Sequence, residues 1–480
     1  MLTYSFDDRE GESLYGHLYR CIKRDIEAGA IPADEKLPSK RAFAKHLGVS
    51  LITVEGAYQQ LVAEGYVRSE PRRGYYANAI APLAGVGAAK GGRVERRLLD
   101  VSAAPRAAEP PLLANLASGS VAAELFPYAV WARTMRDVLA REPERTLLRE
   151  APSMGSPRLR KALAAHLRSF RGLEVDPAQI LVGSGAQTLY NLLVQLLGRQ
   201  RRFAVEDPGY PRLTRIYQAN DVPLVHVPID DGGIDVAALL ASGADIAHLM
   251  PSHQFPTGLV TPVSRRYELL VWANDAPGRY VIEDDYDCEF RLAGRPIPTM
   301  ASIDAGERVV YANTFSRSLG PAFRIAYAVL PEHLAERFEH DLGFYSCTVS
   351  TMEQLALAHF IEHGDFERHV NRMRIHYRAV RDELAAALAT SRVGDRLDVE
   401  GSEAGLHFLL RVASPATEVQ LAAAARAEGV ALAPLSAFHA NGEGSQDAAA
   451  CRFVVNYAGL DHAAVPAVAE ALARAVEAVS

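Results

Sequence analysis

The stretch Val281-Ile-Glu-Asp-Asp-Tyr-Asp-Cys-Glu-Phe290, with Asn313-Thr-Phe-Ser-Arg-Ser-Leu-Gly-Pro-Ala-Phe-Arg324 further along, decides the fold of this chain. Tyr280 to Ile282 predicts a short buried strand that delivers carboxylates and a tyrosine to its C-terminal end. In an open α/β sheet, ligands bind at that end of the strands. Strand and helix patterns alternate from residue 112 onward, which favours an α/β layout with a mainly parallel sheet.

The two ends of this stretch differ in chemistry. The first has four acids in five positions, too many to stay ionised without partners: Glu283, Asp284, Asp285 and Asp287. Some of them must therefore face a positive charge, and a metal ion, arginines or a protonated ring nitrogen would supply it. The second end has hydroxyl groups and arginines, a composition typical of phosphate binding: Thr314, Ser316, Arg317, Ser318 and Arg324.

These residues carry a resemblance. Asp284-x-Tyr286, with Ser316-Arg317-Ser318 thirty-three positions later (317 − 284), is similar to the cofactor floor of fold-type I pyridoxal-phosphate enzymes. The pattern IEDDYDCEF…TFSRS most resembles the aminotransferase-like half of MocR/GabR-type transcription regulators. The resemblance implies that Asp284 pairs with the pyridine nitrogen and Tyr286 with the ring hydroxyl. It also implies a lysine that binds the cofactor as a Schiff base, and that position holds Arg317.

The arginine at 317 excludes covalent cofactor chemistry. A Schiff base needs an amine that can lose its proton, and a guanidinium with a pKa above about 12 cannot serve. No lysine follows Lys161 in the chain, and Lys161 itself lies on an amphipathic surface helix predicted for residues 158–170. Only six lysines occur among the 51 basic residues, so a general bias toward arginine is one explanation for the arginine at 317. A deliberate substitution is the other.

Length and composition set the frame. A chain of 480 residues is too long for one compact core, so two or more domains are expected. The net charge of −7 argues against a chain that binds nucleic acid over its whole surface, although one domain still can. Four cysteines stand far apart without a CxxC pair, which predicts a reducing cytoplasm and no metal site. No signal region or run of eighteen apolar residues occurs, so we expect a soluble cytoplasmic protein without a membrane partner.

The N-terminal segment predicts a DNA-binding unit. Helices are expected over 13–28, 40–47 and 51–64, the last two joined by a tight turn at Gly48, and two strands with a basic turn follow over 66–76. Residues 36–73 carry seven arginines and lysines against three glutamates at 55, 64 and 70. This positive excess suits phosphate contacts, although a small module with a solvated basic face is the alternative.

Residues 11–78 resemble the GntR winged helix through LPSKRAFAKHLGVSLITVEGAYQQLVAEGYV. The resemblance implies a recognition helix that opens at Ser50 to Thr53, and a head-to-tail homodimer that reads paired half-sites of duplex DNA. It implies the following DNA contacts: Lys40, Arg41, Ser50, Thr53, Arg68, Arg72 and Arg73. Leu51 departs from the arginine common in the family at that place. We therefore expect a winged helix over 1–78, a linker over 79–111 and an aminotransferase-like domain over 112–480.

Within that domain, further motifs point to the same pocket. A strand that turns through Gly183 and Gly185 into a helix places backbone N–H groups where they suit a phosphate, although ordinary turns look alike: Ser184, Gly185, Ala186 and Gln187. By resemblance Tyr210 stacks on the cofactor ring, Arg212 contacts a ligand carboxylate, His253 lies beside the cofactor and Arg324 lies beside its phosphate. A Pro-Gly turn with an exposed tyrosine and a structural histidine are the alternatives.

The C-terminal part, from about Leu330, is predicted to be a smaller, mostly helical α+β domain with strands over 405–412 and 452–457. The family arginine that holds an amino acid's carboxylate aligns here with Val454, and Arg452 is a doubtful substitute.

Two functions compete. The first is a regulator whose aminotransferase-like domain senses a small effector, either a pyridoxal-phosphate-type vitamer bound noncovalently or an amino acid, and repositions the winged helix. In that case the pocket keeps a noncovalent pyridoxal 5'-phosphate site or has drifted to another anionic ligand. The second is an aminotransferase with an accessory DNA-binding domain. The second needs a lysine at 317 and leaves the basic winged helix unexplained, so the sequence favours the first.

Overall fold

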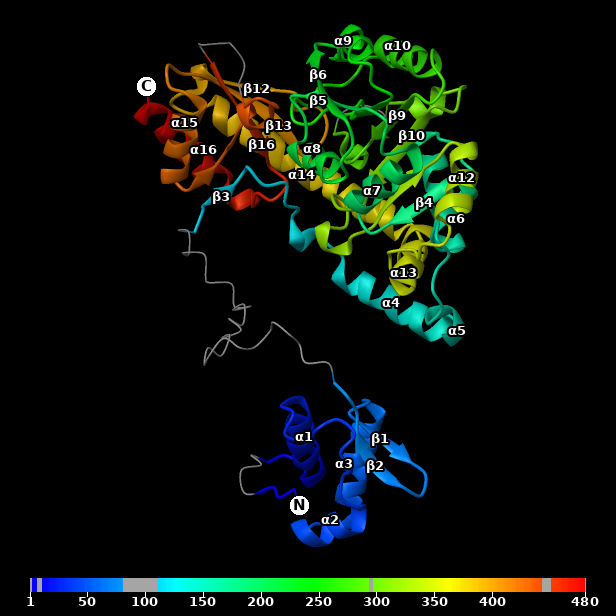
Figure 1. Ribbon diagram of the computed structural model, residues 1–480. Coiled ribbons are helices and arrows are strands. Elements are labelled where there is room, and N and C mark those ends of the chain that lie inside the picture. The colour runs from blue at the N-terminus through cyan, green and yellow to red at the C-terminus, as the bar shows by residue number, and fades with distance from the viewer. Residues whose placement is uncertain (1, 7–10, 81–110, 293–296, 443–449, 480) are drawn as a thin grey trace. The chain divides into compact units, whose positions relative to one another are not determined.

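The computed structural model describes residues 2–6, 11–80, 111–292, 297–442 and 450–479 (Figure 1). Contacts divide the chain into two compact units, 1–108 and 109–480. The predicted linker over 79–111 lies almost wholly outside the described residues, so its bounds stay a prediction. No helix in the described part of the chain is both long and apolar enough to cross a membrane.

The first unit is a three-helix winged helix. Its elements are α1 (Leu14–Glu27), α2 (Lys40–Leu47), α3 (Leu51–Ala63), β1 (Val67–Glu70) and β2 (Gly74–Ala77). The predicted helices and wing are confirmed to within a residue or two at their ends. Serines at 13, 39 and 50 cap the three helices, because each side chain accepts a backbone N–H of the first turn.

A single small core holds this unit together. Leu18 and Ile22 of α1 pack with Phe43 of α2 and with Val54 and Tyr58 of α3. Gly48, with φ of 68°, ends α2 in the left-handed conformation that allows the chain to turn directly into α3. The predicted helix-turn-helix is therefore a packed unit rather than an isolated pair of helices.

The second unit is built on a mostly parallel sheet. Within the described residues its eight strands lie in the order β4-β11-β10-β9-β8-β5-β6-β7, and only β11 and β7 run antiparallel to their neighbours. The strands are β4 (Ile180–Gly183), β5 (Phe203–Asp207), β6 (Leu224–Asp230), β7 (Gly233–Ile234), β8 (Ile246–Leu249), β9 (Tyr280–Asp284), β10 (Val309–Thr314) and β11 (Ala326–Val329). The predicted α/β class and mainly parallel sheet are confirmed.

Helices cover both faces of this sheet. They are α4 (Tyr128–Arg141), α5 (Glu144–Leu147), α6 (Pro157–Arg171), α7 (Ala186–Leu197), α8 (Pro211–Ala219), α9 (Val236–Ala241), α10 (Val263–Asn274), α11 (Met300–Ile303), α12 (Glu332–Leu342) and α13 (Thr351–Glu362). On β9, Val281 packs with Leu269 of α10, whereas Ile282 packs with Leu189 of α7. Successive side chains of a strand point to opposite faces, so a strand covered by helices on both sides carries apolar residues on both faces where the helices pack.

The C-terminal part forms a smaller α+β layer. Its elements are α14 (Asp365–Ala389), β12 (Leu397–Glu400), β13 (His407–Ala413), α15 (Glu418–Ala427), β14 (Val430–Ala431), β15 (Ala433–Pro434), β16 (Ala450–Asn456) and α16 (Val465–Ala478). The predicted strand pair is confirmed as β13 and β16, which pair antiparallel. The segment that precedes the large sheet belongs here too, because β3 (Ala114–Asn115) pairs with β14.

Candidate functional site

The carboxylates at the C-terminal end of β9 divide between two faces of the sheet. Glu283 and Asp285 share one face and Asp284 points to the other, as the two-residue period of a strand requires. Glu283 is fully buried and accepts the backbone N–H groups of Met300 and Ala301 at 2.8 and 2.9 Å. Burial raises the pKa of Glu283 to about 7, with Asp285 adding to the effect. Glu283 therefore supports the start of α11 and is not a pocket residue.

Asp284 lies in a buried polar chain. Tyr190 of α7 donates a hydrogen bond to its Oδ2 at 2.5 Å, and His248 Nε2 lies 3.5 Å from the same oxygen. His248 Nδ1 in turn lies 2.6 Å from the hydroxyl of Tyr217. Burial and then Asp284 raise the pKa of Tyr190 well above its usual value, so the phenol stays protonated and donates. Both contacts use Oδ2, and the carboxylate is held in one orientation.

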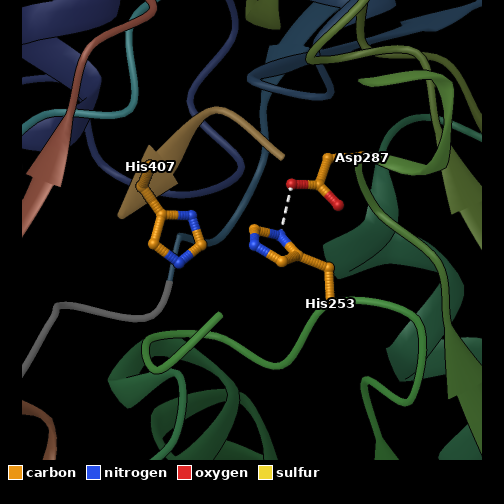
Figure 2. A group of neighbouring side chains, drawn as sticks. All are labelled: His253, Asp287 and His407. Atoms are coloured by element: carbon orange, nitrogen blue, oxygen red, sulfur yellow. Dashed lines mark hydrogen bonds and ion pairs between the residues drawn. The ribbon is translucent and has the colours of Figure 1, made fainter. Parts of the chain in front are cut away.

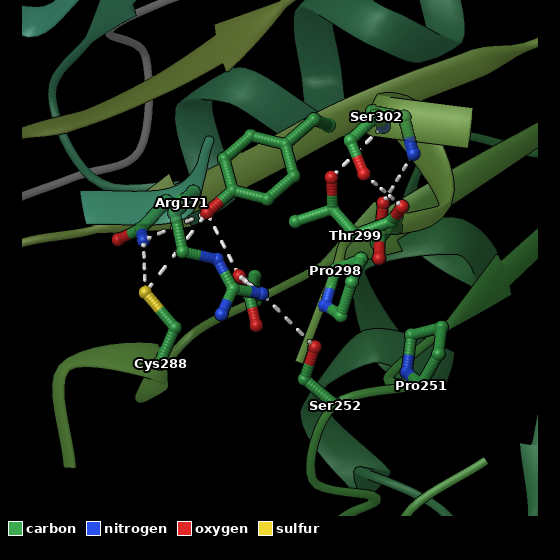
Figure 3. Close-up of polar contacts among 12 residues, drawn as sticks. Arg171, Pro251, Ser252, Cys288, Pro298, Thr299 and Ser302 are labelled. Carbon is green, nitrogen blue, oxygen red and sulfur yellow. Dashed lines mark hydrogen bonds and ion pairs between the residues drawn. The ribbon is translucent and has the colours of Figure 1, made fainter. Parts of the chain in front are cut away.

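Asp285 forms the buried ion pair that the acid cluster required. Arg171 Nη2, at the end of α6, lies 2.7 Å from Asp285 Oδ2, and the two side chains are 2% and 1% exposed. Tyr311 of β10 donates to the same oxygen at 2.8 Å, and Arg171 also donates to Ser252 at 3.3 Å (Figure 3). Burial, the largest single effect, lowers the pKa of Arg171, but Asp285 and the neighbouring acidic groups together outweigh it, and the net shift is upward. This ion pair fixes the position of the backbone directly after Asp284.

His253 connects Asp287 to Tyr286. Its Nδ1 lies 2.9 Å from Asp287 Oδ2 and 3.1 Å from the Tyr286 hydroxyl, and the ring of His407 approaches from β13 (Figure 2). Burial and then Asp287 raise the pKa of Tyr286, whereas Arg317 opposes the shift. Burial, His253 and Arg317 lower the pKa of His407. This cluster holds the phenol of Tyr286 protonated and in place.

The same group has the composition of a metal site. Ligand atoms of His253, Asp287 and His407 lie within 4.8 Å of one another. However, His253 Nδ1 already faces Asp287, and His407 Nε2 lies 3.2 Å from the carbonyl of Pro256. A Cβ at Gly405 would overlap the His253 ring, so the space beside the ring is filled by backbone. These contacts fit the support of Tyr286 better than they fit ion binding.

Arg317 lies between Tyr286 and the N-terminal segment of the large unit. Its guanidinium lies 5.9 Å from the Tyr286 ring centre, and its Nη1 donates to the carbonyl of Gly119. A Cβ at position 119 would collide with the guanidinium, so the contact needs a glycine there. Arg317 is half-buried. It therefore has a defined place beside the tyrosine of the Asp284-x-Tyr286 motif, not in free solvent.

The hydroxyl residues after β10 do not all face one way. Thr314 Oγ1 lies 2.9 Å from Ser316 Oγ, and the backbone N–H of Ser316 donates to Thr314. Ser318 is 1% exposed, its carbonyl lies 2.6 Å from His369 Nε2, and its hydroxyl has no hydrogen-bond partner among the described residues. Of these hydroxyl residues, Thr314 and Ser316 contact each other, whereas Ser318 is packed inside, and their contact with a phosphate stays a prediction.

A cradle forms where β4 turns into α7. Gly185 has φ of 84° and caps α7, so Ala186 and Gln187 supply the first backbone N–H groups of the helix. Arg324 Nη2 donates to the carbonyl of Ser184 at 3.2 Å. A Cβ at Gly185 would lie 2.7 Å from Arg324 Nη2, so only glycine leaves this space open. A cation and a positive helix end meet here, as anion binding requires.

Tyr210 caps α8 and makes an edge-on contact with Phe255 at 5.7 Å between ring centres. The exposed guanidinium of Arg212 lies 6.0 Å from the Tyr210 ring centre. Gln254, fully buried, donates to the carbonyl of Pro208 and accepts from Thr257, and so ties this loop to the 250–258 loop.

The residues that sequence reasoning set aside lie apart from these contacts. Lys161 is exposed on α6. Arg452 lies 3.7 Å from Glu400 in an ion pair, and Val454 is fully buried.

The proposed DNA-contact residues fall into two groups. Arg41, Arg72 and Arg73 are exposed, and Arg73 pairs only loosely with Glu70 at 3.4 Å. By contrast, Lys40 pairs with Glu55, and Arg68 lies 2.7 Å from Asp34 and also donates to the carbonyl of Ala77. The hydroxyl of Ser50 accepts the backbone N–H of Thr53 at 3.1 Å and lies 2.8 Å from the Thr53 hydroxyl. In this unit Lys40, Arg68, Ser50 and Thr53 are thus occupied by local contacts.

Comparison with known proteins decides the family. The model of aminotransferases of class I and II matches residues 113–472, and that of the gntR family of bacterial regulatory proteins matches residues 14–76. The regulator YdeL of Bacillus subtilis is 36% identical over 88% of this chain and 89% of its own length. The probable rhizopine catabolism regulatory protein MocR of Rhizobium meliloti is 31% identical over 95% and 92%. The chain belongs to the MocR-type regulators of the gntR family.

The large unit of this regulator has the aminotransferase fold. The α-aminoadipate aminotransferase LysN of Thermus thermophilus, solved in complex with N-(5'-phosphopyridoxyl)-L-leucine, matches with a TM-score of 0.64 at 26% identity. The match covers 77% of this chain and 92% of that enzyme. The MocR-type regulator therefore combines a DNA-binding winged helix with an aminotransferase-like domain, and it functions in transcription.

Several contacts of this regulator were not anticipated from sequence. Tyr190 stands on the helix that begins at Ala186, one turn beyond the predicted phosphate turn, and helical periodicity could have placed it near Asp284. No sequence motif marks Arg171 or Gly119 as a contact residue, because their partners lie more than 100 residues away in the chain. The exposure of Leu51 and Ile52 was not predicted either, because an amphipathic pattern alone predicts that apolar residues are buried.

Proposed function

We propose that this regulator binds a small anionic effector, a pyridoxal-phosphate-type vitamer or an amino acid, noncovalently in its aminotransferase-like domain. The observation that carries the proposal is Arg317, which stands where the resemblance places the Schiff-base lysine and whose guanidinium lies 5.9 Å from the ring centre of Tyr286. A guanidinium binds carboxylate and phosphate well but cannot act as a nucleophile. The pocket thus keeps recognition groups and lacks the amine that catalysis needs.

The residues present fit a phosphorylated pyridine ring. The carboxylate of Asp284 would accept from the ring nitrogen through Oδ1, which neither Tyr190 nor His248 uses. Tyr286, held by His253, would donate to the ring hydroxyl, and Tyr210 would cover a ring face. The backbone N–H groups of Ala186 and Gln187, with Arg324, Thr314 and Ser316, would hold the phosphate. The N–H groups of Ser184 and Gly185 already donate to Thr348 and to the carbonyl of Gly183. When bound, an aldehyde-bearing cofactor supplies an electrophilic carbon, and position 317 offers it no amine.

An aminotransferase function is the weaker candidate. Among the chain's own groups, no lysine follows Lys161, and Lys161 is exposed on α6. The carboxylate anchor also aligns with a buried valine at 454 rather than with an arginine. We therefore propose that the domain has no transaminase activity.

Arg317 also suggests how ligand binding is transmitted from the pocket to the winged helix. Its contact with Gly119 joins the pocket to the segment that directly follows the linker in sequence. That segment is anchored on both sides of Gly119, because the Asn456 N–H donates to the Leu116 carbonyl and the Ala122 N–H donates to the Tyr377 hydroxyl at 3.3 Å. An anionic ligand that competes with the Gly119 carbonyl for the guanidinium would loosen the segment. The change would reach the winged helix through the linker.

We propose that the regulator works in the cytoplasm as a head-to-tail homodimer on duplex DNA with paired half-sites. The large unit of the single chain exposes large apolar side chains, as surfaces for another protein do: Tyr128, Leu139, Leu148, Phe344 and Tyr345. Light scattering of the full chain, at twice the mass of 52.1 kDa, tests this assembly.

Absorbance titration tests the effector proposal. Pyridoxal phosphate added to the wild type should be bound, by equilibrium dialysis, without an imine absorbance band, and borohydride should fix none of it. Arg317→Lys supplies the amine and should gain both the band and the trapped adduct. Arg317→Gln, a matched variant of similar length without charge or amine, should gain neither and should lose affinity for the phosphorylated ligand.

Two results would contradict the proposal. A trapped adduct in the wild type would show that another amine reaches the pocket. No dialysis binding in either the wild type or Arg317→Lys would show that the site does not accept this ligand.

A further inference from the structure

The recognition helix presents an apolar pair to solvent. Ile52, 80% exposed, is the most exposed large apolar side chain in the described part of the winged helix, and Leu51 beside it is 41% exposed. They are the first two residues of α3, directly after the cap at Ser50. The core of the unit does not need them, because Val54, Ala57, Tyr58 and Leu61 form the buried face of α3.

The same helix has no cation to offer to a base edge. Its sequence from Leu51 to Ala63, LITVEGAYQQLVA, contains neither lysine nor arginine. Its glutamate, Glu55, pairs with Lys40 of α2, and the hydroxyls of Ser50 and Thr53 face each other. Exposed cations of the unit stand elsewhere, among them Arg41 on α2 and Arg72 and Arg73 on the wing. Charge can therefore hold the phosphates, while the leading turn of α3 remains apolar.

Only one group in the major groove suits such a surface. Base edges there present hydrogen-bond donors and acceptors, and the 5-methyl of thymine is the apolar exception. The N-terminal residues of a recognition helix are those that reach base edges. We infer that Leu51 and Ile52 read thymine methyl groups in each operator half-site. This inference rests on the DNA-binding function and adds the kind of base that is recognised.

Replacing thymine by deoxyuridine tests the contact directly, because it removes the methyl and keeps base pairing. Full-length protein would first select duplexes from a random library, and each thymine of the enriched half-site would then be replaced singly. At one or two positions, uracil should weaken wild-type binding about four-fold per half-site. That factor corresponds to one methyl-sized group buried, about 0.8 kcal/mol at 1.4 kcal/mol per ten-fold.

The variants assign the contact to its side chains. Ile52→Ala and Leu51→Ala should bind the thymine duplex more weakly and should lose discrimination against uracil at their own position. Both residues are exposed at a helix start, so folding should be unaffected, with thermal unfolding within a few degrees of wild type. Val62→Ala is the matched control, because it truncates another exposed apolar residue near the end of α3, and it should behave as wild type.

Three outcomes would overturn the inference. The first is a wild type that binds its selected duplex equally well with every thymine replaced. The second is discrimination that persists in both alanine variants. The third is an Ile52→Ala effect on the oligomeric state with no change in discrimination, which would assign the pair to a protein contact. A library from which no duplex is enriched would instead refute sequence-specific DNA binding itself.

Discussion

Arg171→Met should strongly destabilise the large unit. The substitution keeps an apolar stem of similar length and removes only the guanidinium, so Asp285 is left charged and buried with Tyr311 as its remaining donor. Removing one member of a buried ion pair costs about 3–5 kcal/mol, chiefly because the other charge loses its compensation. Asp285 is 1% exposed, so water cannot replace the lost partner without local opening.

The same helix provides a control ion pair with the same N···O distance. Arg168 Nε lies 2.7 Å from Glu174 Oε2, the distance that separates Arg171 from Asp285, but these side chains are 64% and 70% exposed. Exposed pairs contribute at most about 1 kcal/mol because solvent screens them. Arg168→Met should therefore change stability little, and the contrast isolates burial from distance.

Urea denaturation of the full chain, followed by far-ultraviolet circular dichroism, gives the free energies of unfolding. The double variant Arg171→Met with Asp285→Asn should recover part of the loss, since the neutral amide no longer needs a cation and still accepts from Tyr311. Equal stabilities of Arg171→Met and Arg168→Met would refute the argument, and so would a double variant less stable than Arg171→Met alone.

Three further predictions concern pH and DNA. Burial raises the pKa of Glu289 from 4.5 to about 7, so its contribution to stability is full below pH 4.5 and is lost as the pH rises through about 7. Glu289→Gln should flatten the decline in unfolding free energy over this window, by up to about 3 kcal/mol, and an unchanged decline in urea titrations would contradict this. Arg41→Ala should weaken operator binding and lower its salt dependence by about one ion, whereas the fragment 112–480 should not shift DNA in a gel. A shift by that fragment equal to that of the full chain would disprove the domain assignment.

Local patterns determined the elements and much of the site. A serine cap, an apolar stripe and a terminal glycine are local signals, so α2 began and ended where they predicted, at Lys40 and Leu47. A run of apolar residues followed by acids likewise placed β9 and the turn after it. Because the motif at 284–286 and the residue at 317 are both read directly from the chain, the prediction that no Schiff base forms also comes from the sequence.

Only the tertiary structure decided which partner each group has. The acid cluster required cations, but the choice among a metal, arginines and a protonated ring nitrogen depended on α6 and the 250–258 loop returning to β9, and no local pattern encodes that return. Ser318 and Ser316 are of the same type and two residues apart, yet one is buried and the other is not, because the chain turns between them. Ile52 is an apolar residue of the kind found in protein cores, and its exposure follows from the packing of α3 through Val54 and Tyr58. Burial and pairing are properties of distant segments brought together, and these properties distinguish a binding group from a structural one.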